Sequence, residues 1–554
     1  PNPQLDIFTA PSMQLGSRAS KKYSDPNSWH NQFYSLVTTK IDEEIFKPLF
    51  PEGKKSGRPN ASIRILVAMS VLKEGFGCSD EDLFEKCEFD LLTRKALGME
   101  LLTDVTPSID TYYLFRRRIC EYQERTGIDL MQLCFEQLAG NQIRLLKISG
   151  KCVRMDSKLI GSNIARQSRY ELIHTTLVKF LKTCTLTHLS PEQEERAKEY
   201  LKEDSSKTVY RSDSDTLQSN LARIGNFIME MLAAFPATSP AHDLLQRLFD
   251  EQYVVMDGKA VLRDKKEVKA DSLQNPNDPD ATYRSKNDQK VQGYVTNITE
   301  TVEEGKPNII TSVQVETAVF ADCHFLQEAV ENSERVTDST IKDLYADGAY
   351  QSPDNREFAK NHNAMQLKTG KMQGGCRWEL IPHDEDGLTI REIATGNTYE
   401  AVKAVTKQGS RKRWRIPWNN KTGWRYFEDK DIKAYQLRKQ IESLPLEEQH
   451  KRNNVEAAMF QYCFHTRNGK TRYRGLLKHR MHAYSRCMWM NLRRMVIFQI
   501  STFQRSIFAL FGPIREAFGS FKAIFRKIFT SGADCYVSLR MTTLVRLDSK
   551  YAPF

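Results

Sequence analysis

The first part of the chain places hydrophobic residues at helical spacing. One such set is Ile63, Leu66, Val67, Met69 and Leu72. The segments 80–86, 90–97 and 109–122 keep the same period of three to four residues, which is typical of helices with one buried face. Thr106-Pro107-Ser108 is a helix start signal, because proline is tolerated in the first turn and serine caps it. We therefore predict a helical region over residues 1–145, with a loose polar arm up to about residue 30.

The pattern changes after residue 148, where apolar and polar side chains alternate. Val153 and Met155 fall on one side of this segment, whereas Arg154 and Asp156 fall on the other. This alternation predicts a strand. Three later segments also predict strands: residues 291–298, 308–313 and 341–346. Between the first strand and these, residues 165–270 return to helical spacing as far as Val254, which predicts a helical insertion.

The remaining regions alternate between strand and helix signals. Residues 358–450 contain a Gly374-Gly375 pair, a hairpin signal at Gly396-Asn397 and alternation near Ile390, so we predict a β-rich insertion. Helical apolar stripes resume afterwards, and the chain closes with a basic helical tail over residues 501–554. The sequence therefore predicts an α/β core that is interrupted twice. Its three parts are residues 146–164, 271–357 and 451–500.

Composition restricts the class of protein. The 554 residues are 40% apolar and 10% aromatic, which is enough for several packed domains. The eleven cysteines include no C-x-x-C pair, so a structural zinc site is unsupported, and we expect reduced, mostly buried thiols in a cytoplasmic protein. No charged leader precedes an apolar run, and the apolar stretches are interrupted by polar residues, so we expect no membrane span.

Positive charge is concentrated near the C-terminal end of the predicted core. The formal net charge is +11, and residues 451–494 contain eleven Lys and Arg against one acid. A local positive field suits a polyanion such as DNA, because neutralising phosphates releases counterions. The candidate DNA-binding residues in this region are Lys470, Arg472, Arg474 and Lys478. The alternative is a solvated basic face.

Two other basic motifs are candidates for DNA contact. Arg116 and Arg117 belong to a triple arginine on a predicted helix, for which a solvated face is the alternative. Arg411, Arg413 and Trp414 belong to a segment that interleaves cations with aromatic residues, a composition suited to phosphates and exposed bases. The alternative for this segment is that the tryptophans face the core of a small sheet.

Three acidic residues are the candidates for catalysis. Asp156 lies at or near the end of the first predicted strand, Asp347 stands where a later strand ends, and Glu456 lies on a predicted helix. Carboxylates are the ligands that hard divalent cations such as Mg²⁺ prefer, and two such ions can activate water and stabilise the leaving oxygen of a phosphodiester. Arg452, one helical turn before Glu456, would project toward the same flank. Three unrelated surface acids are the alternative.

Several short motifs carry a resemblance to a known family. They are Gly57-Arg58-Pro59, Phe115-Arg116-Arg117, Asp156-Ser157, Ser162-Asn163, Tyr170-Glu171-Leu172-Ile173, Asp280-Ala281-Thr282-Tyr283-Arg284, Gly293-Tyr294 and Asp347-Gly348-Ala349-Tyr350. With the order Asp156, Asp347 and Glu456, the chain resembles the DDE transposases of bacterial insertion sequences over roughly residues 40–500. The insertion-sequence 1182 group is the most similar subgroup.

The resemblance implies both a fold and an activity. The core would be a ribonuclease-H-like mixed sheet flanked by helices, and the N-terminal helices would serve in DNA binding or dimerisation. The enzyme would cleave DNA at the terminal inverted repeats of a mobile element and join the 3′ ends to target DNA. It would use two Mg²⁺ ions per active site, with Mn²⁺ as a substitute, and no nucleotide cofactor. It would be at least a homodimer when two ends are synapsed, and it would work near the bacterial nucleoid.

The resemblance also assigns residue roles. Asp156 and Asp347 would hold the metal ions, with Asp156 shared between them, while Glu456 would complete the site or position water. Relatives often carry a Tyr, Arg, Glu and Lys signature around the third acid. Arg452 would hold a phosphate, because it and Glu456 match this signature, but Gln449 and Cys463 stand at the Tyr and Lys positions. A cation elsewhere, Lys470 or Arg467, would then replace the lysine. A metal-dependent DNA nuclease and a non-catalytic DNA-binding regulator are the alternative functions.

Overall fold

The computed structural model describes residues 11–50, 61–237, 239–286, 289–369, 376–383, 387–405, 412–418, 423–443 and 445–528. Contacts between residues separate a compact unit over residues 1–496 from a second unit over residues 497–554. The described part of the second unit is the end of one long helix, α19 (Leu476–Ile528). No helix among the described residues is both long and apolar enough to cross a membrane.

The N-terminal region is helical, as its spacing predicts. Its elements are α2 (Pro11–Gln14), α3 (Ser17–Ser24), α4 (Trp29–Leu36), η1 (Thr38–Lys40), η2 (Glu43–Leu49), α5 (Ile63–Phe76), α6 (Asp80–Phe89), α7 (Leu91–Leu97), α8 (Ile109–Thr126) and α9 (Leu130–Leu146). The start signal before α8 works as expected, because the Ser108 side chain accepts a hydrogen bond from the backbone N–H of Thr111.

The prediction of a loose arm up to about residue 30 is wrong for residues 11–30, whereas residues 1–10 lie outside the described part of the chain. Tyr23 and His30 are buried, and His30 Nε2 lies 2.8 Å from the carbonyl oxygen of Tyr23. Trp29 and Phe33 pack against Trp489, with ring centroids 6.3 and 6.1 Å apart. Trp489 of α19 thus packs against the end of this segment, a contact that no local pattern could indicate.

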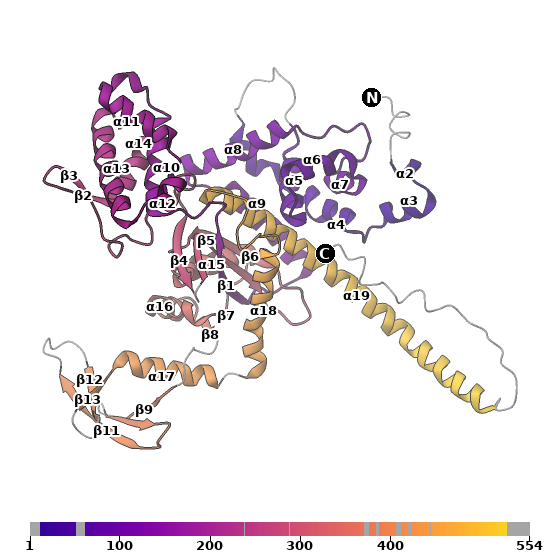
Figure 1. Ribbon diagram of the computed structural model, residues 1–554. Coiled ribbons are helices and arrows are strands. Elements are labelled where there is room, and N and C mark those ends of the chain that lie inside the picture. The colour runs from indigo at the N-terminus through magenta and orange to yellow at the C-terminus, as the bar shows by residue number, and fades with distance from the viewer. Residues whose placement is uncertain are drawn as a thin grey trace. The chain divides into compact units, whose positions relative to one another are not determined.

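A mixed sheet forms the centre of the unit (Figure 1). Its strands are β4 (Thr282–Lys286), β5 (Gln289–Thr301), β1 (Cys152–Gly161), β7 (Asp343–Ala346) and β8 (Gln366–Thr369) in spatial order, and β6 (Ile310–Thr317) pairs with β5. The neighbours β1 and β5 run antiparallel, as do β5 and β6, whereas β1, β7 and β8 run parallel. The expectation of an α/β core with a mixed sheet is met.

The alternation along β1 separates the two faces of the sheet. Val153 and Met155 are buried in a core that includes Leu326 and Val330 of α15 (Leu326–Thr337). The opposite face is covered by α18 (Leu446–Cys463), which contacts β1 and β7. Polar residues at the alternate positions of β1 therefore face this helix.

The core extends beyond the boundary predicted at residue 357. Helix α16 (Pro353–Asn361) leads into β8, which pairs with β7 in parallel through Leu344 and Leu367. These residues were predicted to open the β-rich insertion. Because β8 has only four residues and its partner lies across a helical crossover, its sequence pattern is too short to indicate a core strand.

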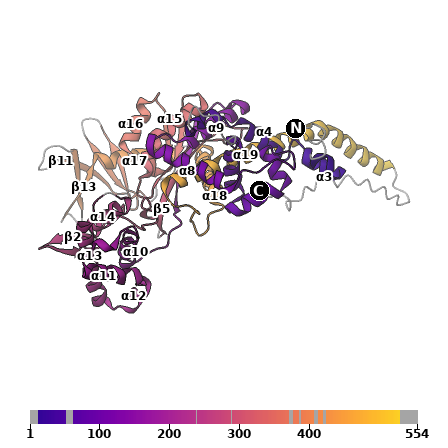
Figure 2. The ribbon, with the colours of Figure 1, turned by 90° about the horizontal axis from the view of Figure 1, so that it is seen from above.

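The helical insertion is a separate bundle (Figures 1 and 2). It contains α10 (Arg169–Leu181), η3 (Leu186–His188), α11 (Pro191–Lys202), α12 (Ser205–Arg211), α13 (Ser214–Ala234), α14 (Pro240–Gln252) and the hairpin β2 (Tyr253–Met256) and β3 (Lys259–Leu262). The prediction of helix as far as Val254 is wrong at its end. Asp257 and Gly258, with φ of 49° and 72°, form a two-residue hairpin turn. The Asp-Gly pair is the signal that could have indicated it.

The β-rich insertion is a five-stranded antiparallel sheet followed by α17 (Asp429–Glu442). Its strands are β9 (Trp378–Pro382), β10 (Leu388–Glu392), β11 (Thr398–Val405), β12 (Lys412–Trp418) and β13 (Gly423–Glu428). The hairpin predicted at Gly396-Asn397 is present, since Arg391 pairs with Thr398 across it and Gly396 has a φ of 74°. The Gly374-Gly375 pair lies outside the described residues.

A polar joint connects the N-terminal helices to the last part of the core. The Glu74 carboxylate at the end of α5 accepts a hydrogen bond from the Tyr473 hydroxyl, and it lies 2.7 Å from Nδ1 of His482. Arg486 donates to the carbonyl oxygens of Glu74 (2.9 Å) and Gly75 (3.2 Å). It also donates to the carbonyl oxygen of Gln461 in α18 at 2.5 Å, so one side chain fixes the ends of two helices.

This joint predicts a stability change in acid. Burial alone would raise the pKa of Glu74, but His482 and the hydrogen bonds lower it to about 2 from 4.5. A carboxyl whose folded pKa is depressed stabilises the fold above its unfolded pKa, and this stabilisation is lost as pH falls toward the folded value. We expect Glu74→Gln to lower the urea midpoint at pH 7. The difference in urea midpoint between this variant and the wild type should become smaller as the pH falls from 4.5 to 2.

The control for this measurement is Glu88→Gln, which changes an exposed glutamate of α6. It should leave the urea midpoint close to that of the wild type at every pH. A Glu74→Gln gap that is as wide at pH 3 as at pH 7 would contradict the proposed role of the joint.

Candidate active site

The three candidate acids line a single cavity. Asp156 of β1, Asp347 after β7 and Glu456 of α18 surround a space of about 630 Å³. Lys158 and Lys286 line the same cavity. Asp156 and Asp347 are half-buried, and Glu456 is exposed. The fold thus brings together carboxylates from three elements that are far apart in the sequence.

The pairing of parallel strands explains why the two aspartates lie side by side. Arg154 of β1 pairs with Tyr345 of β7. Continued for two residues past this last pair, the same offset leads from Arg154 to Asp156 and from Tyr345 to Asp347. Backbone N–H groups orient both side chains, because Oδ1 of Asp156 accepts from Ser157 at 2.8 Å and Oδ1 of Asp347 accepts from Gly348 at 2.6 Å.

A buried ionic cluster positions the helix that carries Glu456. The carboxylate of Glu300 in β5 is fully buried, and Arg154 donates to it from Nε at 2.6 Å. Arg494 of α19 donates to its other oxygen at 2.6 Å. Nη1 of Arg154 also donates to the carbonyl oxygen of Lys451 in α18 at 2.7 Å. Arg154 therefore fixes α18 to the strand that carries Asp156.

A second ionic contact acts at the beginning of α18. Lys368 of β8 lies 2.9 Å from Asp343 of β7 and 3.0 Å from Glu448 of α18. Burial would lower the pKa of Lys368, but the two carboxylates raise it, so this lysine stays charged. Two independent contacts thus hold the helix across the parallel strands.

Tyr350 is a buried neighbour of the two aspartates. Its hydroxyl donates to Oδ1 of Asn297 at 2.7 Å, and the side chain is fully buried. Burial raises the pKa of Tyr350 well above 10, and the carboxylates of Asp156 and Asp347 raise it further. The phenol is therefore protonated, and it donates its hydrogen bond to Asn297 rather than to an aspartate.

The donor set fits a divalent cation. Among the described residues, no three His, Cys, Asp or Glu side chains lie close enough to form a metal-holding group. The cavity presents the hard carboxylate oxygens of Asp156, Asp347 and Glu456, and its lining also includes Met459 and Cys463. Mg²⁺ is commonly bound through one or two carboxylates and completes its shell with water and substrate phosphate, so a closed cage of three ligands is not required.

Sequence reasoning missed the two lysines in this cavity. Lys158 follows Asp156 by two positions on the same strand, so the alternation could have indicated that both share one face. Lys286 comes from β4, and no local signal connects it to the acids. Its ammonium also lies 3.5 Å from the buried carboxylate of Asp322.

Four of the predicted DNA-binding residues meet at another cavity. Arg116, Arg117, Arg472 and Lys478 line a space of about 870 Å³ between α8 and the segment that leads into α19. Arg472 donates hydrogen bonds to the carbonyl oxygens of Gly77 and Cys78.

The other predicted residues of the basic segment lie apart from that cavity. Lys470 lines a separate cavity beside the acids, and Arg474 is exposed and donates from Nε to the carbonyl oxygen of Asn163 at 2.7 Å. Arg452 lies in α18, but its side chain is outside the described residues.

The β-rich insertion places its cations and aromatic residues differently. Trp414 is only 4% exposed and belongs to the core of the small sheet, which was the alternative for this motif. Arg413 pairs with Glu428 at 2.9 Å and lies over the ring of Tyr426. Arg411 is outside the described residues.

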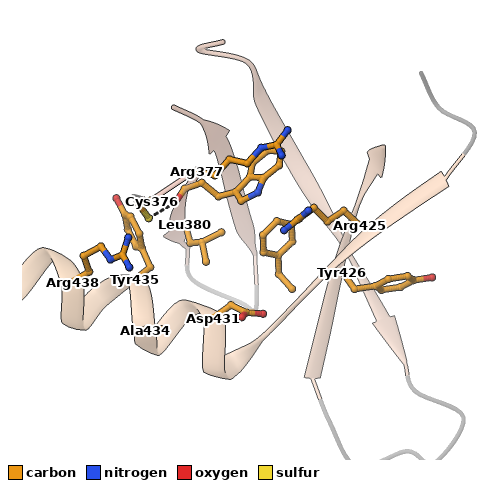
Figure 3. Close-up of a pocket in the computed structure, with 11 residues that line it drawn as sticks. Cys376, Arg377, Leu380, Arg425, Tyr426, Asp431, Ala434, Tyr435 and Arg438 are labelled. Carbon is orange, nitrogen blue, oxygen red and sulfur yellow. Dashed lines mark hydrogen bonds between the residues drawn. The ribbon is translucent and has the colours of Figure 1, made fainter. Parts of the chain in front are cut away.

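A small cavity of about 260 Å³ opens beside this core (Figure 3). Sequence reasoning did not single out the residues that line it. Arg377 and Arg425 contribute, and each guanidinium lies 5.5 Å from the ring centroid of Trp378. The cations of this sheet are thus largely engaged with its own aromatic rings.

Comparison with known proteins gives one match. The family described as "Transposase domain (DUF772)" matches residues 22–118, which run from the end of α3 to the middle of α8 and include Arg116 and Arg117. The match supports a transposase family for this protein. The matched span lies within the N-terminal helices and contains none of the three acids. No curated protein and no solved structure matches the chain.

The buried cluster around Arg154 predicts that an Arg-to-Lys substitution there destabilises the fold more than the same substitution in an exposed ion pair. Arg154→Lys keeps the charge but removes the forked donors that serve Glu300 and Lys451 together. We expect a loss of about 2–3 kcal/mol in the free energy of urea unfolding, because hydrogen bonds to a buried charged group are lost.

The matched control is Arg196→Lys in the helical insertion. Arg196 pairs with Glu230 at 3.0 Å, and both side chains are 35% exposed. This change should cost under about 1 kcal/mol, because solvent screens the pair. Equal losses for the two variants would show that Arg154 contributes no more than a surface ion pair.

Proposed function

We infer that this protein is a DNA transposase that cleaves DNA at the ends of a mobile element and joins the 3′ ends to target DNA. The observation that carries this proposal is the single cavity lined by Asp156, Asp347 and Glu456. The transposase match over residues 22–118 supports the same class from a different part of the chain. The two observations are independent, because the matched helices contribute none of the acids.

The finer family assignment belongs to the same proposal. The central sheet combines an antiparallel run, β1, β5 and β6, with parallel strands β7 and β8 on the other side of β1. This order supports a ribonuclease-H-like core of the DDE type. The motifs around the acids support a place near the insertion-sequence 1182 group.

The residues of the cavity would divide the chemistry among them. Asp156 and Asp347 would hold divalent cations, two Mg²⁺ ions per site with Mn²⁺ as a substitute, and Glu456 would complete the set from α18. Bound cations would activate water and stabilise the leaving 3′ oxygen of the cleaved phosphodiester. Lys158 and Lys286 place positive charge where the substrate phosphates would lie. Arg452 would contact a flanking phosphate.

DNA would be both substrate and partner. The terminal inverted repeats would be held first and the target DNA second, and cleavage of two synapsed ends calls for at least a homodimer. The cations at the cavity between α8 and α19, including Arg117 and Lys478, would contact the DNA backbone. No nucleotide cofactor enters this scheme, and the protein would act in the bacterial cytoplasm.

The first test separates cleavage from binding. Asp347→Asn removes a carboxylate from the cavity but leaves the distributed phosphate contacts in place. With Mg²⁺ and a labelled DNA fragment that flanks the reading frame, we expect cleavage to fall by roughly 100-fold or more. The affinity for the same labelled DNA fragment, measured by gel shift without metal, should stay within about twofold of that of the wild type.

The matched control is Asp354→Asn, which changes an exposed aspartate of α16 and should leave cleavage unchanged. Retained cleavage in Asp347→Asn would remove this residue from the active site. Lost cleavage in both variants would point to a general effect of the substitution.

A second test distinguishes transposition from simple DNA cutting. The wild-type protein, Mg²⁺, a labelled end fragment and a supercoiled plasmid are incubated together, and joined products are separated by size. We expect labelled plasmid to appear, because the liberated 3′ hydroxyl attacks target DNA at the same carboxylates. Nicked fragments without any joined species would identify a metal-dependent nuclease instead. Binding without cleavage of either kind would identify a DNA-binding regulator.

A further inference from the structure

A second cavity adjoins the one that holds the acids. It measures about 510 Å³ and is lined by residues of β1, the start of β5 and the segment after α18. Four residues line both cavities: Lys158, Leu159, Gln289 and Cys463. A ligand that fills one cavity therefore comes into contact with the wall of the other.

The lining of this second cavity is strongly positive. It includes four cations, Lys158, Arg166, Lys290 and Lys470, and no described acid. Arg166 donates to the carbonyl oxygen of Lys290 at 2.5 Å, and Lys470 donates to the carbonyl oxygen of Ile164 at 2.7 Å. Carbonyl oxygens orient these side chains without neutralising their charge. Arg166 and Lys290 are exposed, so their charge is open to an anion from solvent.

Backbone contacts fix the cations relative to the acids. Gly161 at the end of β1 donates to the carbonyl oxygen of Gly469 at 2.8 Å, and Thr471 donates back to Gly161 at 3.0 Å. A Cβ atom at Gly161 would lie 2.8 Å from Cγ of Lys470, so only glycine permits this close approach. The strand that carries Asp156 thus also positions Lys470.

We propose that this basic cavity binds the phosphodiester backbone of the DNA strand whose phosphate reaches the acids. The strand then runs along β1 from Asp156 toward Gly161. This inference rests on the proposed function, since it assigns a path to the DNA that the acids cleave. A basic cavity that adjoins a cavity lined by carboxylates suits a polyanion, because the cations can bind its phosphates while the carboxylates act at the cleaved bond.

The distance along β1 sets the scale of the contact. A strand rises about 3.3 Å per residue, so Asp156 and Gly161 lie ~16 Å apart. One strand of a DNA duplex carries a phosphate about every 3.4 Å along the helix axis. The basic cavity therefore holds phosphates within about five nucleotides of the cleaved bond.

The test measures how DNA affinity depends on salt. The full chain and the double variant Arg166→Ala, Lys290→Ala are titrated onto a fluorescein-labelled 30-base-pair duplex of random sequence, without divalent ions and from 50 to 300 mM salt. Each lost phosphate contact lowers the slope of log affinity against log salt by about 0.9. We expect the slope of the double variant to be smaller in magnitude than that of the wild type by about one to two, and its melting temperature to be unchanged.

The matched control is the double variant Lys202→Ala, Arg211→Ala. It removes one lysine and one arginine that are exposed in α11 and α12, and it should keep the wild-type slope. An unchanged slope in Arg166→Ala, Lys290→Ala would overturn the proposed path. A second result would also overturn it. If a deoxynucleoside triphosphate raises the melting temperature of the wild type but not of this double variant, while the slope stays unchanged, the cavity binds a free nucleotide instead.

The experiment distinguishes a failure of the proposed DNA path from a failure of the proposed function. If the wild type cleaves DNA and the double variant keeps both cleavage and slope, only the path along β1 fails. If the wild type never cleaves but the double variant still loses slope, the cavity stands as a DNA-binding site and the transposase proposal fails.

Discussion

One buried carboxylate holds the candidate active site together. Glu300 has no solvent exposure, and a charge in that position is costly unless it is paired and hydrogen-bonded. Arg154 and Arg494 satisfy it from β1 and α19. Because Arg154 also donates to the backbone of Lys451, the same cluster sets the position of α18 against the sheet. The place of Glu456 beside the two aspartates follows from this arrangement.

The carboxylates of the cavity repel one another, and nearby N–H groups and lysines reduce this repulsion. The offset of the parallel pairing leads to both Asp156 and Asp347, and both carboxylates line the cavity. Backbone N–H groups and the lysines that line the cavity offset this repulsion only in part. The neighbouring Tyr350 stays neutral, because burial and the nearby carboxylates keep its hydroxyl protonated. An electronegative cavity of this kind attracts cations, and the adjoining basic cavity attracts phosphate.

The structure places seven of the residues predicted to bind DNA in three different settings. Arg116, Arg117, Arg472 and Lys478 come from opposite ends of the chain and line one cavity. Lys470 joins exposed cations of β5 and the β1–α10 connection at the cavity beside the acids. In the β-rich insertion, by contrast, Trp414 is buried and Arg413 is paired with Glu428, so composition alone overstated the surface available to DNA there. Basic and aromatic interleaving fits a nucleic-acid surface and a folded core equally well.

The sequence alone indicated most helical and strand regions and singled out three acids that line one cavity, because periodicity and strand ends are local properties. It misplaced the ends of elements where the deciding partner is distant. Tyr23 and His30 are ordered beside residues that pack on Trp489, and β8 is defined by its pairing with β7. The Asp257-Gly258 turn was a local signal that the helical pattern obscured. Only the tertiary structure decided that Lys158 and Lys286 share the acids' cavity and that Arg154 reaches α18, since these contacts join segments that no sequence spacing relates.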